Sequence, residues 1–163
     1  MNAHINISFR DRIIYVIFFL SILPCLIFAQ IPELESIPQN LPDDIHKILI
    51  KLHGKLDSQL DKLTFHNDLF KIEYAAVEQG SDREKQAYIE LDKLNQEKND
   101  YCNSAIKYNQ LVSTAITISD LKKQIALITK DKSLTYNNES KNLKDIRNDL
   151  SKNETLFYQV LKK

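Results

Sequence analysis

The sequence predicts an all-α protein, an antiparallel bundle of five or six helices with one long central helix. The 163-residue chain contains two glycines and four prolines, and no proline follows Pro42. Sheets, sandwiches and barrels need many tight turns, which depend on glycine and proline, so this composition disfavours them. Apolar residues also recur every three or four positions along most of the chain, which is the spacing of amphipathic helices.

Residues 1–29 have the features of a secretory signal peptide. Two arginines precede residues 13–28, which carry no charged side chain, and Ala29 places a small residue at the expected cleavage edge. A membrane-spanning helix needs about 20 apolar residues, more than this segment offers, and Pro24 would disturb such a helix. We therefore expect cleavage after Ala29 and a secreted, extracellular protein, which meets a membrane only if the signal stays uncleaved.

The helical domain is expected over residues 42–163, after an extended lead-in at residues 30–41 that contains two prolines. The first helix begins at Pro42, followed by two aspartates that suit the positive end of the helix dipole. Its apolar stripe consists of Ile45, Ile48, Leu49, Leu52 and Leu56, with Gly54 near its end. A second helix is expected from Gln59 to Glu78, ended by Gly80.

The third helix is the long central one. It begins at a capping box formed by Ser81 and Glu84. Its stripe alternates steps of four and three: Ala87, Leu91, Leu94, Lys98, Tyr101, Ala105, Tyr108 and Val112. This is the 3.5-residue period of helices that pack along their length, with Lys98 as a polar interruption. We expect packing inside an antiparallel bundle, and a separate coiled-coil dimer is the alternative.

Three shorter helices complete the predicted bundle. The fourth opens at Thr117, and residues 130–133 form a short connection to the fifth. Their stripes are Leu121, Ile125 and Ile128 in the fourth helix and Leu143, Ile146 and Leu150 in the fifth. A second capping box, Ser151 to Glu154, is expected to open the last helix.

Composition and spacing argue against several classes of function. Acidic and basic residues balance at 22 each and are interleaved, whereas a nucleic-acid binder concentrates positive charge. Phosphate-binding loops need closely spaced glycines, which Gly54 and Gly80 are not. His46 and His53 lie seven residues apart, about 10.5 Å along a helix, so they cannot share a metal. We therefore expect neither an enzyme nor a nucleic-acid partner.

Cysteines and glycosylation triplets agree with export. Cys25 leaves with the signal, so Cys102 has no partner in the mature chain and is a free thiol. That thiol is either a part-buried small side chain or half of a bridge that makes a homodimer. Asn138 and Asn153 each begin an acceptor triplet for glycosylation. A lipoprotein signal with Cys25 as the lipidated residue is a weaker alternative, because a proline rather than a small residue precedes this cysteine.

Two kinds of ligand remain open. Asp145 and Asp149 share a face of the fifth helix, with Asn142 beside them, and Glu97 and Asp100 share a face of the third. Carboxylates are the ligands that calcium and magnesium prefer, so these residues are candidate metal ligands, with a solvated charged face as the alternative. A small apolar ligand could instead enter between helices lined by aromatic residues, although aromatic residues at helical spacing more often belong to the core. They are Tyr101, Tyr108, Phe157 and Tyr158.

The carboxy-terminal half resembles the nematode SXP/RAL family of small secreted antigens. The resemblance rests on Ile125-x-x-Ile128-x-x-Asp131-x-Ser133-Leu134-Thr135, followed by Ile146, Leu150 and a short last helix. It covers most of residues 41–163 and implies a helical, cation-binding domain. Members often carry a tryptophan in the second helix, where this chain has Tyr74.

The lead-in Ile31-Pro32-Glu33-Leu34-Glu35-Ser36-Ile37-Pro38 resembles a second family, the nematode fatty-acid and retinol-binding proteins. The sequence therefore predicts a secreted, non-enzymatic helical protein that binds divalent cations or a protein partner. A carrier of fatty acid or retinoid is the alternative. A homodimer is also open, because neither Cys102 nor the long stripe settles the number of chains.

Overall fold

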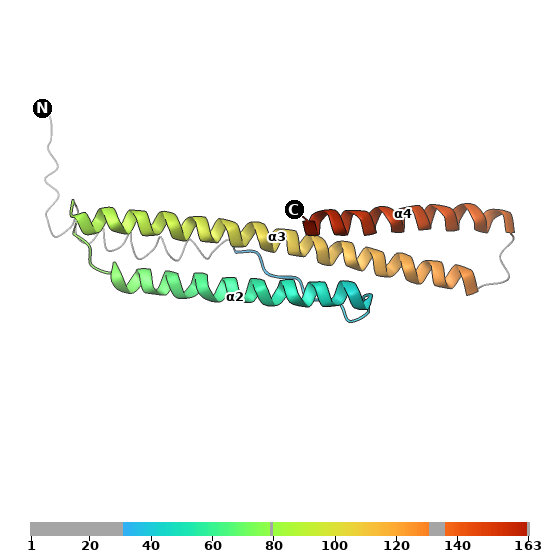
Figure 1. Ribbon diagram of the computed structural model, residues 1–163, viewed down its shortest axis with the longest axis horizontal. Coiled ribbons are helices and arrows are strands. Elements are labelled where there is room, and N and C mark those ends of the chain that lie inside the picture. Colours follow the sequence, from blue (N-terminus) through green and yellow to red (C-terminus); the bar gives the residue numbers. More distant parts are fainter. Residues whose placement is uncertain (1–30, 79, 131–135, 163) are drawn as a thin grey trace, which may run out of the picture. The chain divides into compact units, whose positions relative to one another are not determined.

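The computed structural model describes residues 31–78, 80–130 and 136–162, with side chains for all of these except 136–141. Within these ranges the chain forms three α-helices and no strand (Figure 1). They are α2 (Asp43–Glu73), α3 (Asp82–Lys130) and α4 (Tyr136–Lys162). The predicted all-α class is confirmed, and α3 is the predicted long helix.

The predicted number of five or six helices is wrong for the described residues, because each helix contains two of the predicted ones. α2 passes through Gly54, which costs a helix only about 1 kcal/mol relative to alanine. Leu49 and Leu56, on either side of it, are buried, and their packing holds the helix continuous.

Hydroxyl-containing residues that were expected to start helices lie instead inside them. The Thr117 hydroxyl donates to the Ser113 carbonyl at 3.2 Å, one turn earlier in α3. Ser151 lies inside α4, which begins at Tyr136, so it does not begin a helix. Its carbonyl accepts a hydrogen bond from the Thr155 hydroxyl at 2.8 Å. Serine and threonine can make this bond within a helix as well as a cap, so they mark a boundary only where the chain also turns.

The turn between α2 and α3 is the boundary that the sequence predicts correctly. Gly80 has a φ of 82°, a left-handed conformation that favours glycine over residues with a Cβ. The amide of Glu84 donates to the Ser81 hydroxyl at 3.1 Å, and the Glu84 carboxylate accepts from the Gly80 amide at 2.6 Å. α2 ends at Glu73, earlier than the predicted Glu78, and leaves a loop before this cap.

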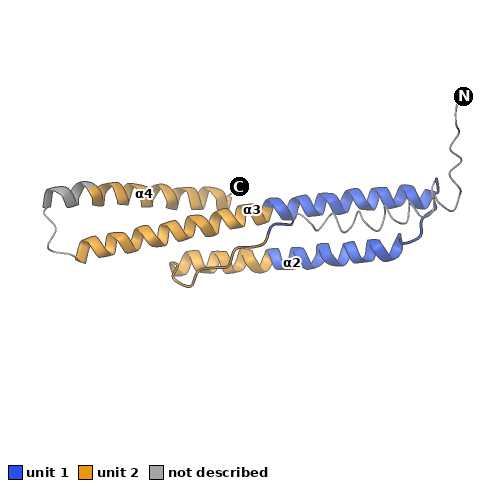
Figure 2. Ribbon diagram, turned by 180° about the vertical axis from the view of Figure 1, so that it is seen from behind, with its two compact units in different colours: residues 1–32, 56–103 blue, residues 33–55, 104–163 orange. Residues whose placement is uncertain are grey.

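Contacts divide the chain into two compact units (Figure 2). Of the described residues, unit 1 comprises 31–32, 56–78 and 80–103, and unit 2 comprises 33–55, 104–130 and 136–162. In unit 1, the second half of α2 packs antiparallel to the first part of α3. The buried apolar residues there are Leu56, Leu63, Phe70, Tyr74, Val77, Ala87, Leu91, Leu94 and Tyr101.

In unit 2, the beginning of α2 packs with the second part of α3 and with α4. Its core contains Leu41, Ile45, Leu49, Ala105, Tyr108, Leu111, Val112, Ala115, Ile118 and Phe157. α4 is joined to α2 by the Tyr158 hydroxyl, which donates to Asp44 at 3.1 Å. It is joined to α3 by Lys122 and Glu154, 3.0 Å apart. The predicted α3 stripe is confirmed in both units, with Lys98 half-buried and its apolar members buried.

The lead-in is attached to α3 of unit 2 by hydrogen bonds. Asn109 makes two of them, donating to the Glu33 carbonyl at 2.8 Å and accepting from the Glu35 amide at 2.9 Å. The Tyr108 hydroxyl donates to the Glu35 carbonyl at 3.1 Å, and the Ser119 hydroxyl to the Asn40 carbonyl at 2.7 Å. These bonds satisfy backbone groups of a segment that has no helix or strand of its own.

Candidate functional site

The four predicted metal ligands are exposed and form two separate pairs. Glu97 accepts a hydrogen bond from His66 at 2.9 Å, and both Glu97 and Asp100 line one hollow of unit 1. Asp145 and Asp149 lie on α4, where Asp149 contacts Lys152 at 3.4 Å. Among the described residues, no group of three or more His, Cys, Asp or Glu side chains is arranged to hold a metal ion. Metal binding therefore stays a prediction.

The thiol and the glycosylation residues occupy ordinary helical positions. Cys102 is a half-buried free cysteine of α3. Asn153 is half-buried, and its side chain donates to the Asp149 carbonyl at 2.8 Å within α4. The Asn138 side chain lies outside the described residues, as does the whole predicted signal peptide. Glycosylation and the intermolecular disulfide stay predictions.

Three of the four aromatic residues that could line an apolar pocket belong to the core. Tyr101, Tyr108 and Phe157 are buried, and Tyr158 is exposed. Tyr108 also packs edge-on against the His53 ring, with ring centroids 5.5 Å apart. Tyr101 also lines one hollow of unit 1, and binding of a small apolar ligand stays a prediction.

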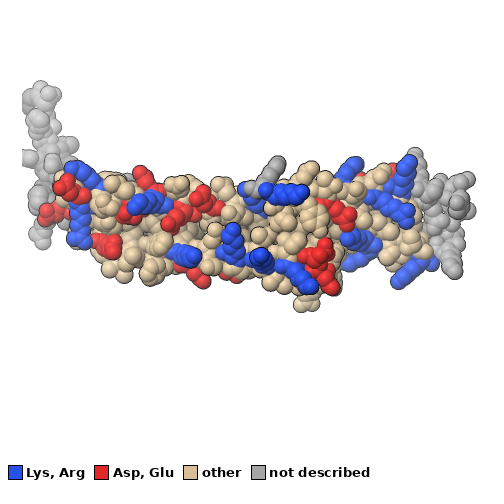
Figure 3. Space-filling model, viewed as in Figure 1, with Lys and Arg blue, Asp and Glu red and all other residues tan. Residues whose placement is uncertain are grey.

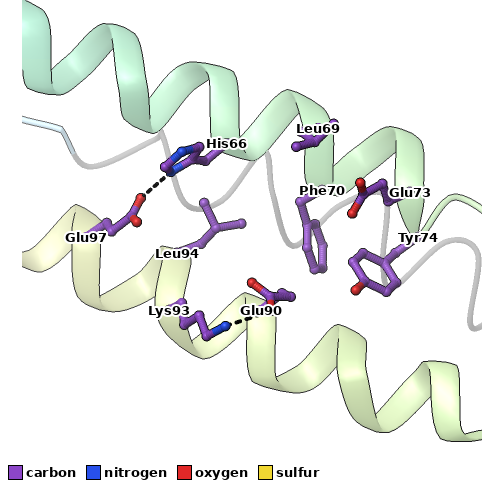
Figure 4. Close-up of a pocket in the computed structure, with 9 residues that line it drawn as sticks. All are labelled: His66, Leu69, Phe70, Glu73, Tyr74, Glu90, Lys93, Leu94 and Glu97. Carbon is purple, nitrogen blue, oxygen red and sulfur yellow. Dashed lines mark hydrogen bonds and ion pairs between the residues drawn. The ribbon is translucent and has the colours of Figure 1, made fainter.

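Unit 1 contains a groove along the seam between α2 and α3, made of two adjoining hollows. The first has a volume of about 180 Å³ and the second about 210 Å³. His66 and Glu97 line both, so their hydrogen-bonded pair marks the place where the hollows meet. The first hollow is lined by Leu69, Phe70, Glu73, Tyr74, Glu90, Lys93 and Leu94 in addition to this pair (Figure 4).

The first hollow combines an apolar floor with an acidic rim. The rings of Phe70 and Tyr74 point between the helices, with centroids 5.0 Å apart, and Leu94 faces them from α3 (Figure 4). Glu90 accepts a hydrogen bond from Lys93 at 2.8 Å, and this bond lowers the pKa of Glu90 below its ordinary value. The carboxylate of Glu73 makes no hydrogen bond or ion pair with the described residues, so it can receive a cation from outside.

A row of exposed apolar side chains borders this groove on α2. Phe65, Leu69 and Ile72 are 65%, 40% and 76% exposed. Their spacing of i, i+4 and i+7 places them on one helical face, which we name the outer stripe. The sequence places Leu69 and Ile72 in an amphipathic helix, but the buried stripe runs through Leu63 and Phe70 instead. Leu69 lies on the groove rim, where stripe and groove meet (Figure 4).

Among the described residues of unit 2, the exposed apolar side chains do not form such a row. On α3 they are Ile106, Ile116 and Leu127, which are ten and eleven residues apart. Ile50 is exposed on α2, and Leu156 and Tyr158, two positions apart, are exposed on α4. Single exposed apolar side chains are normal on protein surfaces, whereas contiguous ones indicate an interaction site. Acidic and basic side chains are interspersed over the face drawn in Figure 3, in agreement with their interleaving in the sequence.

Asn67 is a feature that sequence reasoning missed. It lies in the buried stripe of α2, four residues after Leu63 and three before Phe70, and is only 2% exposed. Its Oδ1 atom is buried and has no hydrogen-bond partner among the described residues. The alternation of four and three through Leu63, Phe70, Tyr74 and Val77 could have located it, because Asn67 completes that series.

Comparisons with known proteins find no match. No family model matches the chain, and neither a curated protein nor a solved structure matches it. No helix in the described ranges combines the length and the apolar character that crossing a bilayer requires. The groove and the outer stripe of unit 1 are therefore the features from which a function is argued.

Proposed function

We propose that this chain is a secreted, non-enzymatic helical protein that binds a protein partner through unit 1. The observation that carries the proposal is the outer stripe. Its spacing is the pattern by which one helix presents anchors to a partner surface or helix. Fully burying a side chain such as Phe, Leu or Ile is worth roughly 1.5–3 kcal/mol. The exposed fractions of Phe65, Leu69 and Ile72 therefore leave several kcal/mol of burial available to a partner.

The test uses two labelled 18-residue amphipathic peptides with the same leucine positions, one with lysine and one with glutamate on the polar face. Fluorescence anisotropy measures their binding to the chain and to a double variant, Phe65→Ala and Ile72→Ala. We expect at least one peptide to bind, and the double variant to weaken binding about tenfold or more. Ile106→Ala removes an apolar residue of unit 2 that is 49% exposed, and should leave binding unchanged. Failure of both peptides to bind the wild-type chain would contradict the proposal.

A divalent cation is the second candidate ligand, and membership of the SXP/RAL family would go with it. Cation binding is supported by the fact that Glu97 and Asp100 line the same hollow, which Gln59 also lines. Calorimetric titration with calcium and with magnesium tests it, and Glu97→Gln should reduce any binding heat. The carrier alternative predicts saturable binding of a fluorescent fatty acid, which no described contact yet favours.

A further inference from the structure

We infer that the groove of unit 1 accepts a basic amphipathic helix of the partner. This inference rests on the proposed function, because it names the chemistry of the partner at the same surface. The partner helix would lie along the seam of α2 and α3, with its apolar face over Leu69 and the floor of the groove. Its lysine or arginine side chains would reach the acidic rim.

The size of the groove fits a helix rather than a single side chain. Its lining residues on the α2 side extend from Gln59 to Tyr74, which is about 22.5 Å at 1.5 Å per residue. A helix of about four turns covers that length. The floor offers Phe70, Tyr74 and Leu94, and the outer stripe continues the apolar surface over the rim through Leu69.

The charges of the lining select a cationic partner. The two hollows together present four carboxylates against two lysines. The acidic members are Glu73, Glu90, Glu97 and Asp100. One of these lysines, Lys93, is already held by Glu90, and the Glu73 carboxylate has no partner among the described residues.

The apolar floor is compatible with a cationic partner. A lysine or arginine can lay its alkyl chain over apolar surface while its charge meets a carboxylate. Phe70 and Tyr74 line the hollow but are only 4% and 9% exposed, so they supply apolar contact and not an open ring face.

A second copy of this chain fits the groove less well. In a symmetric pair the same surface patch faces itself, so the acidic rim of one copy would meet the acidic rim of the other. The outer stripe itself is flanked on α2 by both signs of charge, with Lys62 and Lys71 beside Asp61, Asp68 and Glu73. Lys71 pairs with Asp68 at 3.2 Å, so the like charges that oppose such a pair are those of the groove rim. Juxtaposed like charges oppose association, whereas a basic helix meets complementary charge.

The test compares the lysine and glutamate peptides on the full chain and on the chain beginning at Gln30, with helix content checked by circular dichroism. We expect the lysine peptide to bind about tenfold or more tightly than the glutamate peptide in 20 mM salt, with a smaller difference in 500 mM salt. The double variant Glu73→Gln and Glu90→Gln should weaken lysine-peptide binding about threefold to tenfold. Asp92→Asn removes an exposed carboxylate that does not line the groove, and should change it less than twofold.

The outcomes separate this inference from the proposed function. Suppose that both peptides bind with equal affinity and that the double variant Phe65→Ala and Ile72→Ala weakens the binding of both. The proposal that the outer stripe binds a partner is then supported, and the inferred preference for a basic helix is overturned. The inferred basic preference is also overturned if the double variant Glu73→Gln and Glu90→Gln changes the affinity for the lysine peptide only as much as Asp92→Asn does. A concentration-dependent dimer in sedimentation that is lost with the outer stripe would identify a second copy as the occupant and also overturn it. If neither peptide binds, both proposals fall.

Discussion

Unit 1 and unit 2 are stabilised by different kinds of contact. In unit 2, side chains of α3 bond to the backbone of a segment more than 70 positions earlier, as Asn109 does with Glu33 and Glu35. In unit 1, the contact between α2 and α3 is mainly an apolar seam, crossed by the hydrogen bond between His66 and Glu97.

This difference explains why the candidate site lies in unit 1. Polar contacts in unit 2 are used internally, to attach the lead-in and to join α4 to α2 and α3. In unit 1, one apolar stripe of α2 is buried in the core. A second apolar stripe of α2 and an acidic groove stay exposed. In the part of unit 1 that the structure describes, the two helices bury one stripe each, and the additional apolar residues Phe65, Leu69 and Ile72 remain exposed.

The largest expected effect is on the free energy of unfolding, which should respond differently to the loss of a core aromatic residue and of a surface one. Phe157 in unit 2 is 0% exposed, so Phe157→Ala should lower the free energy of unfolding by about 3–5 kcal/mol. Phe65→Ala in the outer stripe should change it by less than about 0.5 kcal/mol. Urea denaturation monitored by circular dichroism measures both. A loss of comparable size for Phe65→Ala would mean that the outer stripe packs inside the protein.

A second prediction concerns the buried amide of unit 1. Asn67→Leu removes a buried atom that has no hydrogen-bond partner in the described part of the chain, so it should raise the free energy of unfolding by about 1–2 kcal/mol. Asn103→Leu, on an exposed position of α3, is the matched control and should be nearly neutral. The same urea titration measures both variants. Destabilisation by Asn67→Leu would show that the amide is satisfied and contributes to the stability of unit 1.

The attachment of the lead-in gives a third prediction, confined to unit 2. Asn109→Ala removes both side-chain bonds to the lead-in and should cost about 1 kcal/mol of unfolding free energy. The Glu35 amide, which donates to Asn109, should exchange its hydrogen faster. Gln110→Ala alters the neighbouring exposed position and should leave that exchange rate unchanged. Unchanged exchange in Asn109→Ala would contradict the attachment.

The smallest expected effect is a loss of stability at alkaline pH. The hydrogen bond to Asp44 raises the pKa of Tyr158 above its ordinary value of 10.0, and burial raises the pKa of Tyr101. Folding therefore favours the neutral phenols. Their contribution is complete below the unfolded-state pKa and is lost as pH rises through the raised pKa.

Phenylalanine variants measure this contribution. Tyr158→Phe should reduce the fall in unfolding free energy between pH 9 and pH 11, with little change in that slope from Tyr88→Phe, an exposed residue of α3. The measurement is urea denaturation at stepped pH. An alkaline slope that is identical in wild type and Tyr158→Phe would show that the bond to Asp44 contributes nothing to pH-dependent stability.

Local signals in the sequence predict part of this fold. The stripe of α3 and the turn at Gly80 and Ser81 are correct, because heptad spacing and a capping box are each read from adjacent residues. The number of helices is wrong, because Thr117 and Ser151 lie inside helices. The Thr117 hydroxyl donates to the Ser113 carbonyl, and the Ser151 carbonyl accepts from the Thr155 hydroxyl. Only packing with other segments decides whether such a residue begins a helix or lies inside one.

The candidate site was less predictable than the fold. Glu97 was identified as a candidate ligand from its spacing to Asp100, but its contact with His66 joins residues 31 positions apart. Leu69 and Asn67 show the same difficulty, because an apolar residue is expected inside and an amide outside, and the structure reverses both. Which of two possible stripes faces α3 depends on the register of the two helices, which no local pattern specifies.

The most direct test of the account compares the two units in one experiment. Isoleucine and leucine methyl resonances of the chain are recorded while the lysine peptide is added. We predict shifts at Leu69, Ile72 and Leu94 of unit 1, which line the groove or belong to the outer stripe. Exposed methyl groups of unit 2, at Ile116 and Leu127, should stay unchanged. Shifts concentrated on unit 2, with Leu69 and Ile72 unaffected, would contradict the claim that unit 1 carries the binding surface.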